Sequence, residues 1–392
     1  MTRTHATGSQ FRVLVYVFFP SGGISRYSSE MFSAIAKRLP ESAVGLLAPP
    51  EYPWQRGAAT ERLMSISSHH AVVRRARFLL AQIINPLLLI RAARRRRAEW
   101  IHFANVNTVF YPLWGWLLRR SASRVAISVH DVSRTKGIIN LRWELRQLRR
   151  IYRDADALFV HSHEQSAHLV AFADVPRDRI HIVPHGPLPF DGHGTPEPRP
   201  RLLTRLGLDP QCRSALFFGF IRDEKRLDVL LRAMATRPEW QLIVAGNAGA
   251  RGHRPPDHYR RLAADLGLGD RVAFECRFIA DAEVPALFGA ADCVVLPYDT
   301  RFSSQSGVFN VAAEFGTPIL ATPCPSFREI LGRFQIGRIC DGDSPDQLAT
   351  GLTAIDADIR SGRRFDFASY REQNSWDRNA ELTLAAYQKH SD

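Results

Sequence analysis

The chain has 392 residues, of which 45% are hydrophobic and 23% are charged, so it has the composition of a soluble globular protein and is too long for one comfortable core. It fits two domains of about 150–200 residues each. The net charge of +13 comes mostly from arginine and favours a polyanionic partner, meaning nucleic acid, anionic lipid or a phosphorylated substrate. Nucleic acid is the weakest of these, because the sequence shows no helix-turn-helix, zinc-finger or RNP-like pattern.

Strand-like runs alternate with helix-length amphipathic segments along the first half of the chain, which is the pattern of a parallel α/β sheet. A strand over residues 12–18 is followed by a helix over 25–38, in which Met31 and Ile35 recur at helical spacing. Further buried strands are expected at residues 100–103, 125–129, 157–160 and 180–183.

Residues 71–98 contain eight arginines and no acidic residue. Their apolar part, residues 78–90, is interrupted by Gln82, Asn85 and Pro86 and is too short to span a bilayer, which needs about 20 residues. The stretch either lies at a membrane surface with its arginines on lipid phosphates, or forms a core helix with a solvated basic tail. We expect an anionic membrane surface as a partner.

Residues 184–200 hold six prolines and three glycines, which exclude a helix or a central strand, so the interdomain linker is placed there. A second alternating set follows. Its strands are expected at residues 215–218, 241–245, 272–274, 293–296 and 319–321, and a polar helix at residues 376–388. The domains are therefore predicted at residues 1–188 and 201–372, with residues 373–392 as a C-terminal helical segment.

The cysteines and the N-terminal residues bear on the compartment in which the protein works. Five scattered cysteines form no C-x-x-C pair, which argues against a zinc site and a disulfide framework and suits a reducing cytosol. Residues 1–10 lack the apolar core of a signal peptide. We therefore expect a cytoplasmic protein.

In the first half, the first candidate site residues are Gly22 and Gly23, which follow the first strand. Two glycines there let the backbone approach a phosphate or sugar; a plain tight turn is the alternative. His130 follows the strand at 125–129, at the end where ligands of parallel sheets collect. Its imidazole can donate to a sugar hydroxyl or to charge developing on a leaving group; a packed or capping histidine is the alternative. His185 and Gly186 lie in the linker, where glycine permits close ligand approach.

The second half offers a cationic turn and a helix N-terminus. Arg222 and Lys225 follow the Gly219 turn, and two fixed cations there can neutralise a diphosphate. A solvated surface pair is the alternative. Residues 303–307 form a hydroxyl-rich loop before a helix, whose unpaired N–H groups and positive dipole end suit a phosphate.

The order of several motifs resembles one enzyme family. These motifs are G-G-I at residues 22–24, V-H-D at 129–131, A-D-A-L-F-V-H-S at 155–162, V-P-H-G at 183–186, F-F-G-F-I-R-D-E-K at 217–225, V-A-G at 244–246 and the stretch 290–329. Together they resemble the retaining GT-B glycosyltransferases of the family 4-like set, also called group 1, and within it the bacterial exopolysaccharide and lipopolysaccharide type. The resemblance extends over residues 11–390.

The resemblance implies an α/β fold of two Rossmann-like domains facing a central cleft, with the last helix crossing back to the first domain. It also implies a metal-independent enzyme of the hexosyltransferase type. Such an enzyme moves a sugar from a UDP- or GDP-linked donor to a glycan or lipid-linked hydroxyl with retention. It needs no cofactor and works in the cytoplasm or peripherally on the inner face of the cytoplasmic membrane. The catalytic residues would be His130, Arg222 and Lys225, and the donor-binding residues would be Gly22, Gly23, His185, Gly186, Gly219, Gly246, Ser306, Gly307, Val308 and Glu314.

The chain departs from the family at its paired glutamates. Anchoring the register on Gly316 puts Ser303 and Val311 at those positions, whereas sliding it to use Glu314 leaves Ser306 as the partner. At least one glutamate is missing in either register, which puts the donor sugar in doubt. Two alternatives follow: a catalytically silent nucleotide-sugar-binding subunit, which the missing glutamate favours, and a GT-B nucleotide-sugar epimerase, which would need acid/base carboxylates.

Overall fold

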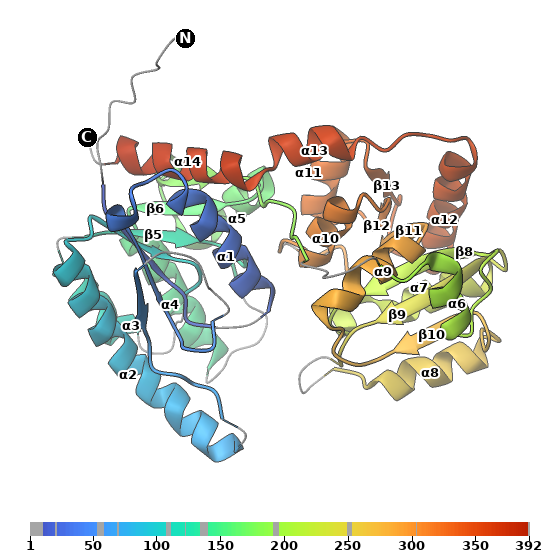
Figure 1. The fold of residues 1–392 in the computed structure, drawn as a ribbon, viewed down its shortest axis with the longest axis horizontal. Coiled ribbons are helices and arrows are strands. Elements are labelled where there is room, and N and C mark those ends of the chain that lie inside the picture. Colours follow the sequence, from blue (N-terminus) through green and yellow to red (C-terminus); the bar gives the residue numbers. More distant parts are fainter. Residues whose placement is uncertain are drawn as a thin grey trace, which may run out of the picture. The chain divides into compact units, whose positions relative to one another are not determined.

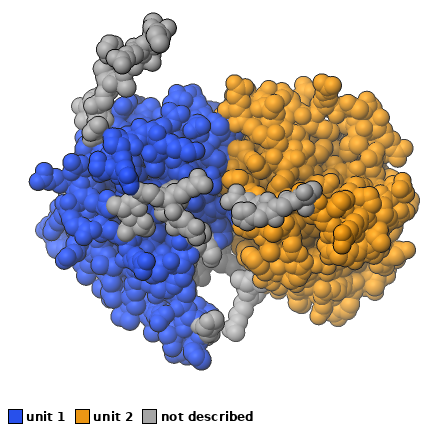
Figure 2. Space-filling view, viewed as in Figure 1, with its two compact units in different colours: residues 1–186, 374–392 blue, residues 187–373 orange. Residues whose placement is uncertain are grey.

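The computed structural model describes residues 11–390 apart from 20–21, 53–58, 69, 107–110, 122, 134–139, 191–195, 249–252 and 303. The chain divides into two compact units (Figure 2). Unit 1 consists of residues 1–186 and 374–392, and unit 2 of residues 187–373. The sequence predicts the linker at residues 184–200, and the division between the units falls after Gly186.

Unit 1 is built on a seven-stranded parallel sheet with the order β3-β2-β1-β4-β5-β6-β7. Figure 1 shows this sheet among the helices α1 to α5. In β1, Val13 is paired with Val44 of β2 on one side and with Trp100 of β4 on the other. Because β1, β2 and β4 are buried along their whole length, helices must cover both faces of the sheet. The strands are β1 (Val13–Tyr16), β2 (Val44–Ala48), β3 (Ala59–Arg62), β4 (Trp100–Phe103), β5 (Arg124–Ser128), β6 (Ala157–Val160) and β7 (Ile180–Ile182). The helices are α1 (Gly23–Ala36), α2 (Ala71–Arg96), α3 (Tyr111–Arg119), α4 (Leu141–Asp154), α5 (His163–Ala173) and α14 (Trp376–Lys389).

The last helix, α14, belongs to unit 1, as the resemblance implied. It packs against α1, and Tyr387 stacks on the buried Trp100 of β4 with ring centroids 4.6 Å apart. Near its start, the Asn379 side-chain amide donates to the carbonyl oxygen of Pro184 at 2.7 Å. The two points at which the chain passes between the units are therefore tied together on the unit 1 side.

Unit 2 carries a six-stranded parallel sheet with the order β10-β9-β8-β11-β12-β13. Because β9 and β10 lie on one side of β8 and β11 to β13 on the other, the order of the strands reverses between β8 and β11. Such a switch point is where ligands of open parallel sheets bind. The strands are β8 (Arg213–Phe218), β9 (Trp240–Ala245), β10 (Val272–Glu275), β11 (Cys293–Leu296), β12 (Ile319–Ala321) and β13 (Gly337–Ile339). The helices are α6 (Arg199–Arg205), α7 (Leu227–Ala235), α8 (Pro256–Asp265), α9 (Val284–Ala290), α10 (Gly307–Phe315), α11 (Pro325–Arg333), α12 (Pro345–Arg360) and α13 (Phe367–Gln373).

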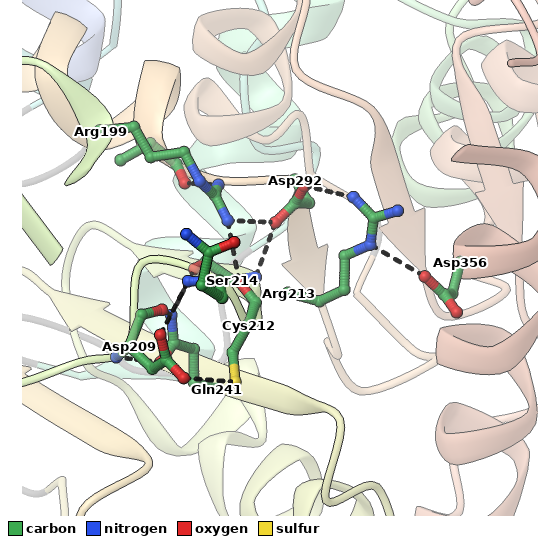
Figure 3. A network of polar contacts seen from close by, with 10 residues as sticks. Arg199, Asp209, Cys212, Arg213, Ser214, Gln241, Asp292 and Asp356 are labelled. Carbon is green, nitrogen blue, oxygen red and sulfur yellow. Dashed lines mark hydrogen bonds and ion pairs between the residues drawn. The ribbon is translucent and has the colours of Figure 1, made fainter. Parts of the chain in front are cut away.

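A polar network fixes the amino ends of β8 and β11 (Figure 3). Asp292 accepts hydrogen bonds from the guanidinium groups of Arg199 and Arg213, each at 2.9 Å, and from the backbone N–H of Ser214 at 2.7 Å. Arg213 also donates to Asp356 of α12 at 3.0 Å. Because these charges are mutually paired at the amino ends of the strands, the network is structural, and the opposite ends of the strands are left for a ligand.

Candidate active site

Two glycine turns meet at the carboxyl ends of β8 and β9 in unit 2. Gly219 has φ of 87° and Gly246 has φ of 148°, conformations that side-chain-bearing residues rarely adopt. A Cβ on Gly246 would overlap the carbonyl oxygen of Gly219. The turns are also joined by backbone hydrogen bonds, from Gly219 N–H to Ala245 and from Ile221 N–H to Asn247, both at 2.9 Å. The glycines thus allow two loops to pack backbone against backbone.

The ammonium group of Lys225 lies beside this turn. Lys225 ends a short 3₁₀ turn, and a Cβ on Gly219 would stand 3.2 Å from its Nζ and 3.3 Å from a methyl group of Val308 in α10. The Nζ lies 5.4 Å from the ring centroid of Tyr298 and donates to the carbonyl oxygen of Phe218 at 3.4 Å. Burial, and secondarily the Arg222 guanidinium, lowers the pKa of Lys225 to about 7. The weakly solvated ammonium group of Lys225 therefore lies between the carboxyl end of β8 and the first turn of α10.

Helix α10 presents its N-terminus at the same place. The Ser306 hydroxyl accepts from the backbone N–H of Phe309 at 3.3 Å and shares a hydrogen bond with the Tyr298 hydroxyl at 3.2 Å, so its side chain caps the helix. Among the described residues no hydrogen-bond acceptor is found for the N–H groups of Gly307 and Val308 in the first turn. These amides and the positive end of the helix dipole favour an anion beside Lys225.

Arg222 is placed differently from Lys225. Its guanidinium is exposed, lies 5.4 Å from the ring centroid of Phe220 and is 3.7 Å from the carboxylate of Glu224. The sequence assigned equal electrostatic roles to both cations. In this geometry Lys225 lies against the glycine turn, whereas Arg222 stands on the surface of the loop with an acidic neighbour.

In unit 1, Gly22 and Gly23 open α1 after β1. Gly22 is the N-cap residue with φ of 86° and no side-chain cap, and among the described residues no atom would lie within 4 Å of a Cβ on either glycine. The first turn of α1 is therefore unobstructed, as a backbone contact to a phosphate or sugar requires, although the positive φ of Gly22 is equally a requirement of the turn itself.

His130 sits at the carboxyl end of β5 in a cluster of rings centred on Tyr27. The Tyr27 ring centroid lies 4.6 Å from His130, 5.1 Å from His161 and 5.0 Å from His185. Burial lowers the pKa of His130 to about 4 and that of His185 to about 4, and it lowers the pKa of His161 as well. All three imidazoles are therefore neutral near pH 7.

The hydrogen bond of His130 limits what its imidazole can do. Nε2 lies 3.0 Å from the carbonyl oxygen of Ala104, and because a carbonyl can only accept, Nε2 carries the proton. A neutral imidazole has one N–H, so the donor is engaged and Nδ1 is left as an acceptor. The sequence predicts that His130 donates; in this structure it can orient a hydroxyl by accepting from it.

Comparison with known proteins places the chain in a family. The model for "Glycosyl transferases group 1" matches residues 201–370, and that for "Glycosyl transferase 4-like domain" matches residues 22–186. The chain belongs to the group 1 glycosyltransferases. Among curated relatives, the D-inositol 3-phosphate glycosyltransferase of Mycolicibacterium vanbaalenii is 32% identical over 248 residues, which cover 59% of this chain and 53% of the relative. That of Mycolicibacterium gilvum is 30% identical over 236 residues, or 60% and 52%. The chain thus spans about half the length of these relatives.

Solved structures of other glycosyltransferases share the GT-B fold over nearly the whole chain. Sucrose-phosphate synthase of Thermosynechococcus elongatus has a TM-score of 0.72 at 18% identity, covering 97% of this chain and 98% of its own. WaaG, a glycosyltransferase involved in lipopolysaccharide biosynthesis, has a TM-score of 0.64 at 19% identity and covers 95% and 98%. Anabaena HepE in complex with UDP-glucose has a TM-score of 0.65 at 16% identity and covers 97% and 98%. These neighbours confirm the predicted fold class.

Two residues that the sequence assigned to the glycosyltransferase's donor have packing roles here. His185 is 9% exposed, and its Nδ1 lies 2.9 Å from the carbonyl oxygen of Gly186. A Cβ on Gly186 would fall 2.5 Å from the Trp376 ring at the start of α14. A glycine is therefore required at position 186, where the chain leaves unit 1, by the close contact with Trp376.

The structure places three of the four residues that could stand at the positions of the family's paired glutamates. Val311 is 3% exposed in the core, so the register anchored on Gly316 leaves no carboxylate there, and Ser303 lies outside the described residues. Glu314 is partly exposed on the last turn of α10, and its carbonyl oxygen accepts from Arg371 at 2.8 Å. Ser306 and Glu314 thus stand at opposite ends of α10, about 12 Å apart along its axis.

Three residues of these clusters were not assigned by sequence reasoning. Tyr298, in the L-P-Y signal after β11, packs beneath Lys225 and bonds Ser306. Tyr27 has no sequence signal beyond its place on the buried face of α1. The Nε2 of buried His161 has no hydrogen-bond partner among the described residues, although Nδ1 lies 3.1 Å from the carbonyl oxygen of Val183.

The loop at residues 277–281 borders a cavity of about 260 Å³ in unit 2. Arg277 is held there by ion pairs with Glu275 and Glu283, at 2.9 Å and 2.5 Å. Glu283 also accepts from the Ala280 backbone N–H at 3.0 Å. The guanidinium pairing lowers the pKa of Glu283 to about 2. The loop is thus held by ion pairs and a hydrogen bond among its own residues and their neighbours.

Proposed function

We propose that this glycosyltransferase transfers a sugar from a UDP- or GDP-linked donor to a hydroxyl of a glycan or lipid-linked acceptor, with retention of anomeric configuration. The observation that carries the proposal is the convergence of Lys225, the Gly219 turn and the amides of Gly307 and Val308. A fixed cation and unpaired N–H groups at a switch point form a site for a diphosphate.

In the proposed reaction, the bond between the anomeric carbon and the diphosphate oxygen breaks and its electron pair stays on the diphosphate. Lys225 and the α10 amides stabilise that charge, and Arg222 adds a second positive charge at the rim. The oxygen of the acceptor hydroxyl forms the new bond from the same face of the sugar, and its proton passes to the departing diphosphate oxygen. Because protein cations and amides supply the stabilisation, we propose that neither a metal ion nor an enzyme nucleophile takes part.

The test is incubation of the purified protein with UDP- and GDP-sugars, with and without EDTA. Release of free nucleotide diphosphate that persists in EDTA is expected. A new sugar isomer would instead identify an epimerase, and saturable binding without turnover would identify a silent subunit, the alternative that the buried Val311 favours. Loss of turnover in EDTA with rescue by manganese would contradict the metal-free mechanism.

We further propose that the enzyme works in the cytoplasm, at the inner face of the cytoplasmic membrane. Lipid-linked acceptors lie in that leaflet, and the arginine-rich, acid-free stretch at residues 71–98 complements anionic headgroups.

Replacing His130 by alanine is expected to lower turnover with little change in nucleotide binding, because the imidazole belongs to unit 1, whereas the Lys225 cluster belongs to unit 2. His130→Gln is the matched control, since its amide can still donate to Ala104. A structural role predicts that glutamine restores turnover together with the thermal midpoint, whereas a role for Nδ1 predicts that it restores the midpoint alone. Because the pKa of His130 is about 4, its contribution should not titrate between pH 6 and 8.

A further inference from the structure

Helix α2 exposes a row of apolar side chains on its outward face, although its inward face is also largely apolar and packs on the core of unit 1. On its outward face the side chains of Leu80, Ile83 and Leu87 are 50%, 46% and 53% exposed, while the inward side chains Gln82 and Asn85 are buried. The exposed apolar row recurs at helical spacing over the first four turns and consists of Val72, Val73, Leu79, Leu80, Ile83, Ile84 and Leu87. An exposed patch of this size marks a docking surface.

The inward face explains why α2 stays attached to unit 1. Asn85 accepts from the Met64 backbone N–H at 2.8 Å, and Phe78 packs against Phe18 with ring centroids 6.0 Å apart. Length and composition alone would let residues 72–96 cross a membrane, but 44% of the most apolar window is buried in the protein. A helix held along one side in this way can lie in a membrane surface but cannot span it.

The charges select the occupant of the outward face. Beyond Leu87 the same face carries Arg91 and Arg94, and exposed arginines at positions 74, 75 and 77 stand at the other end, with no acidic residue from 63 to 98. A second copy of the chain is unfavourable, because parallel pairing of two α2 helices and antiparallel pairing both place arginines against arginines. An anionic lipid leaflet accommodates both features, with apolar side chains in the acyl region and arginines at the phosphates.

The neighbouring helix adds an interfacial aromatic side chain. Helix α3 packs against α2, and its Trp116 is 50% exposed with the Arg120 guanidinium carbon 3.9 Å from the ring centroid. Tryptophan beside arginine is the pairing found at the boundary between headgroups and acyl chains. In Figure 1 the first turns of α2 extend past the strands of unit 1.

We infer that the outward face of α2 inserts into the anionic leaflet of a membrane and that apolar contact, rather than the arginine tail, supplies most of the binding. The arginines at the C-terminal end of α2 are less available to lipid phosphates, because Arg95 and Arg96 pair with Glu61 at 2.6 Å and 3.0 Å. The inference deepens the proposed function by naming the element that binds the membrane. It rests on the proposed function in one respect, which is that a lipid-linked acceptor would lie in the same leaflet.

The experiment is sedimentation with phosphatidylcholine vesicles, with and without phosphatidylglycerol, at low and high salt. Wild type should bind the anionic vesicles and keep part of its binding at high salt, because inserted side chains are not screened. The double variant Ile83→Ser/Leu87→Ser should bind at least about tenfold more weakly. Arg91→Gln/Arg94→Gln should lose the preference for anionic lipid but keep the salt-resistant part. The matched control is Ile339→Ser, which alters an exposed apolar side chain of unit 2 and should bind as wild type.

Three results would overturn the inference. These are no binding of wild type to anionic vesicles at low salt, unchanged binding of the Ile83/Leu87 variant, and a wild-type dimer that this variant dissociates. Quenching of tryptophan fluorescence by brominated lipid, lost in Trp116→Phe, should accompany binding. Release of nucleotide diphosphate from a soluble donor is measured on the same variants and should not change. Failure of the transferase proposal therefore appears in that assay and leaves the vesicle result interpretable.

Discussion

Lys225→Ala is expected to weaken nucleotide-diphosphate binding and to slow turnover by more than tenfold each, equivalent to about 1.4 kcal/mol or more. The reason is its position: the ammonium group adjoins Gly219 and the N-terminus of α10. Partial burial makes its charge act through a low dielectric. Arg222→Ala should have a smaller effect, since its guanidinium is exposed and 3.7 Å from Glu224. Calorimetry with UDP and GDP measures binding, and release of nucleotide from the donor measures turnover.

The control for this prediction is Arg360→Ala, which removes an exposed cation paired with Asp356 at the opposite end of the unit 2 sheet. It should bind nucleotide as wild type does. If Lys225→Ala and Arg360→Ala bind equally well, the diphosphate lies elsewhere and the Lys225 assignment is wrong.

The lowered pKa of Lys225 makes nucleotide binding at the same site depend on pH. Free Lys225 has a pKa of about 7, and a bound diphosphate must raise it, because opposite charge favours the protonated form. Binding therefore takes up a proton above pH 7, and the affinity for a nucleotide sugar should fall as pH rises through that value. Lys225→Arg keeps its charge over this range and should flatten the profile. An unchanged slope in the arginine variant would assign the titration to another group.

Sequence reasoning located strands best where a buried apolar run ends at a polar or turn residue. The runs at 100–103, 157–160, 293–296 and 319–321 have the bounds that were expected. Strands β2, β3 and β13 were not expected. Strand β2 reads V-G-L-L-A, without the alternation or β-branched density of a strand, and β13 is a three-residue edge strand that is largely unburied. Such strands form because a neighbouring strand offers hydrogen bonds, not because of local propensity.

Glycines, histidines and cations at strand ends are visible in the sequence, so candidate site residues could be named from it. What was missed depends on contacts between distant residues. The need for glycine at 186 comes from Trp376, and the donor of His130 is engaged by Ala104. The arginine-rich stretch at residues 71–98 shows the same limit: its composition was clear, but only the fold decides that Phe78 turns inward while Leu79 turns outward.

Gly246→Ala is expected to produce the largest loss of stability in unit 2, about 3 kcal/mol or more, and to abolish nucleotide binding in the molecules that remain folded. The new Cβ would overlap the Gly219 carbonyl oxygen, so the turns after β8 and β9 would have to separate. That separation would move the backbone against which Lys225 and Val308 pack. Urea unfolding followed by a probe in unit 2, together with the thermal shift given by UDP, measures both effects.

Alanine variants of two further glycines of unit 2 distinguish the effect of backbone strain from that of atomic overlap. Gly207 has φ of 73°, and a methyl group added there would meet no atom within 4 Å, so Gly207→Ala should lose only the left-handed conformational term of about 1–2 kcal/mol and bind UDP normally. Gly219→Ala adds contacts of 3.2 Å and 3.3 Å to Lys225 and Val308, which lie at the diphosphate site itself. It should therefore be intermediate in stability but as defective in nucleotide binding as Gly246→Ala. Equal stabilities for the three variants, with normal UDP binding in all of them, would show that the two turns do not build the donor site.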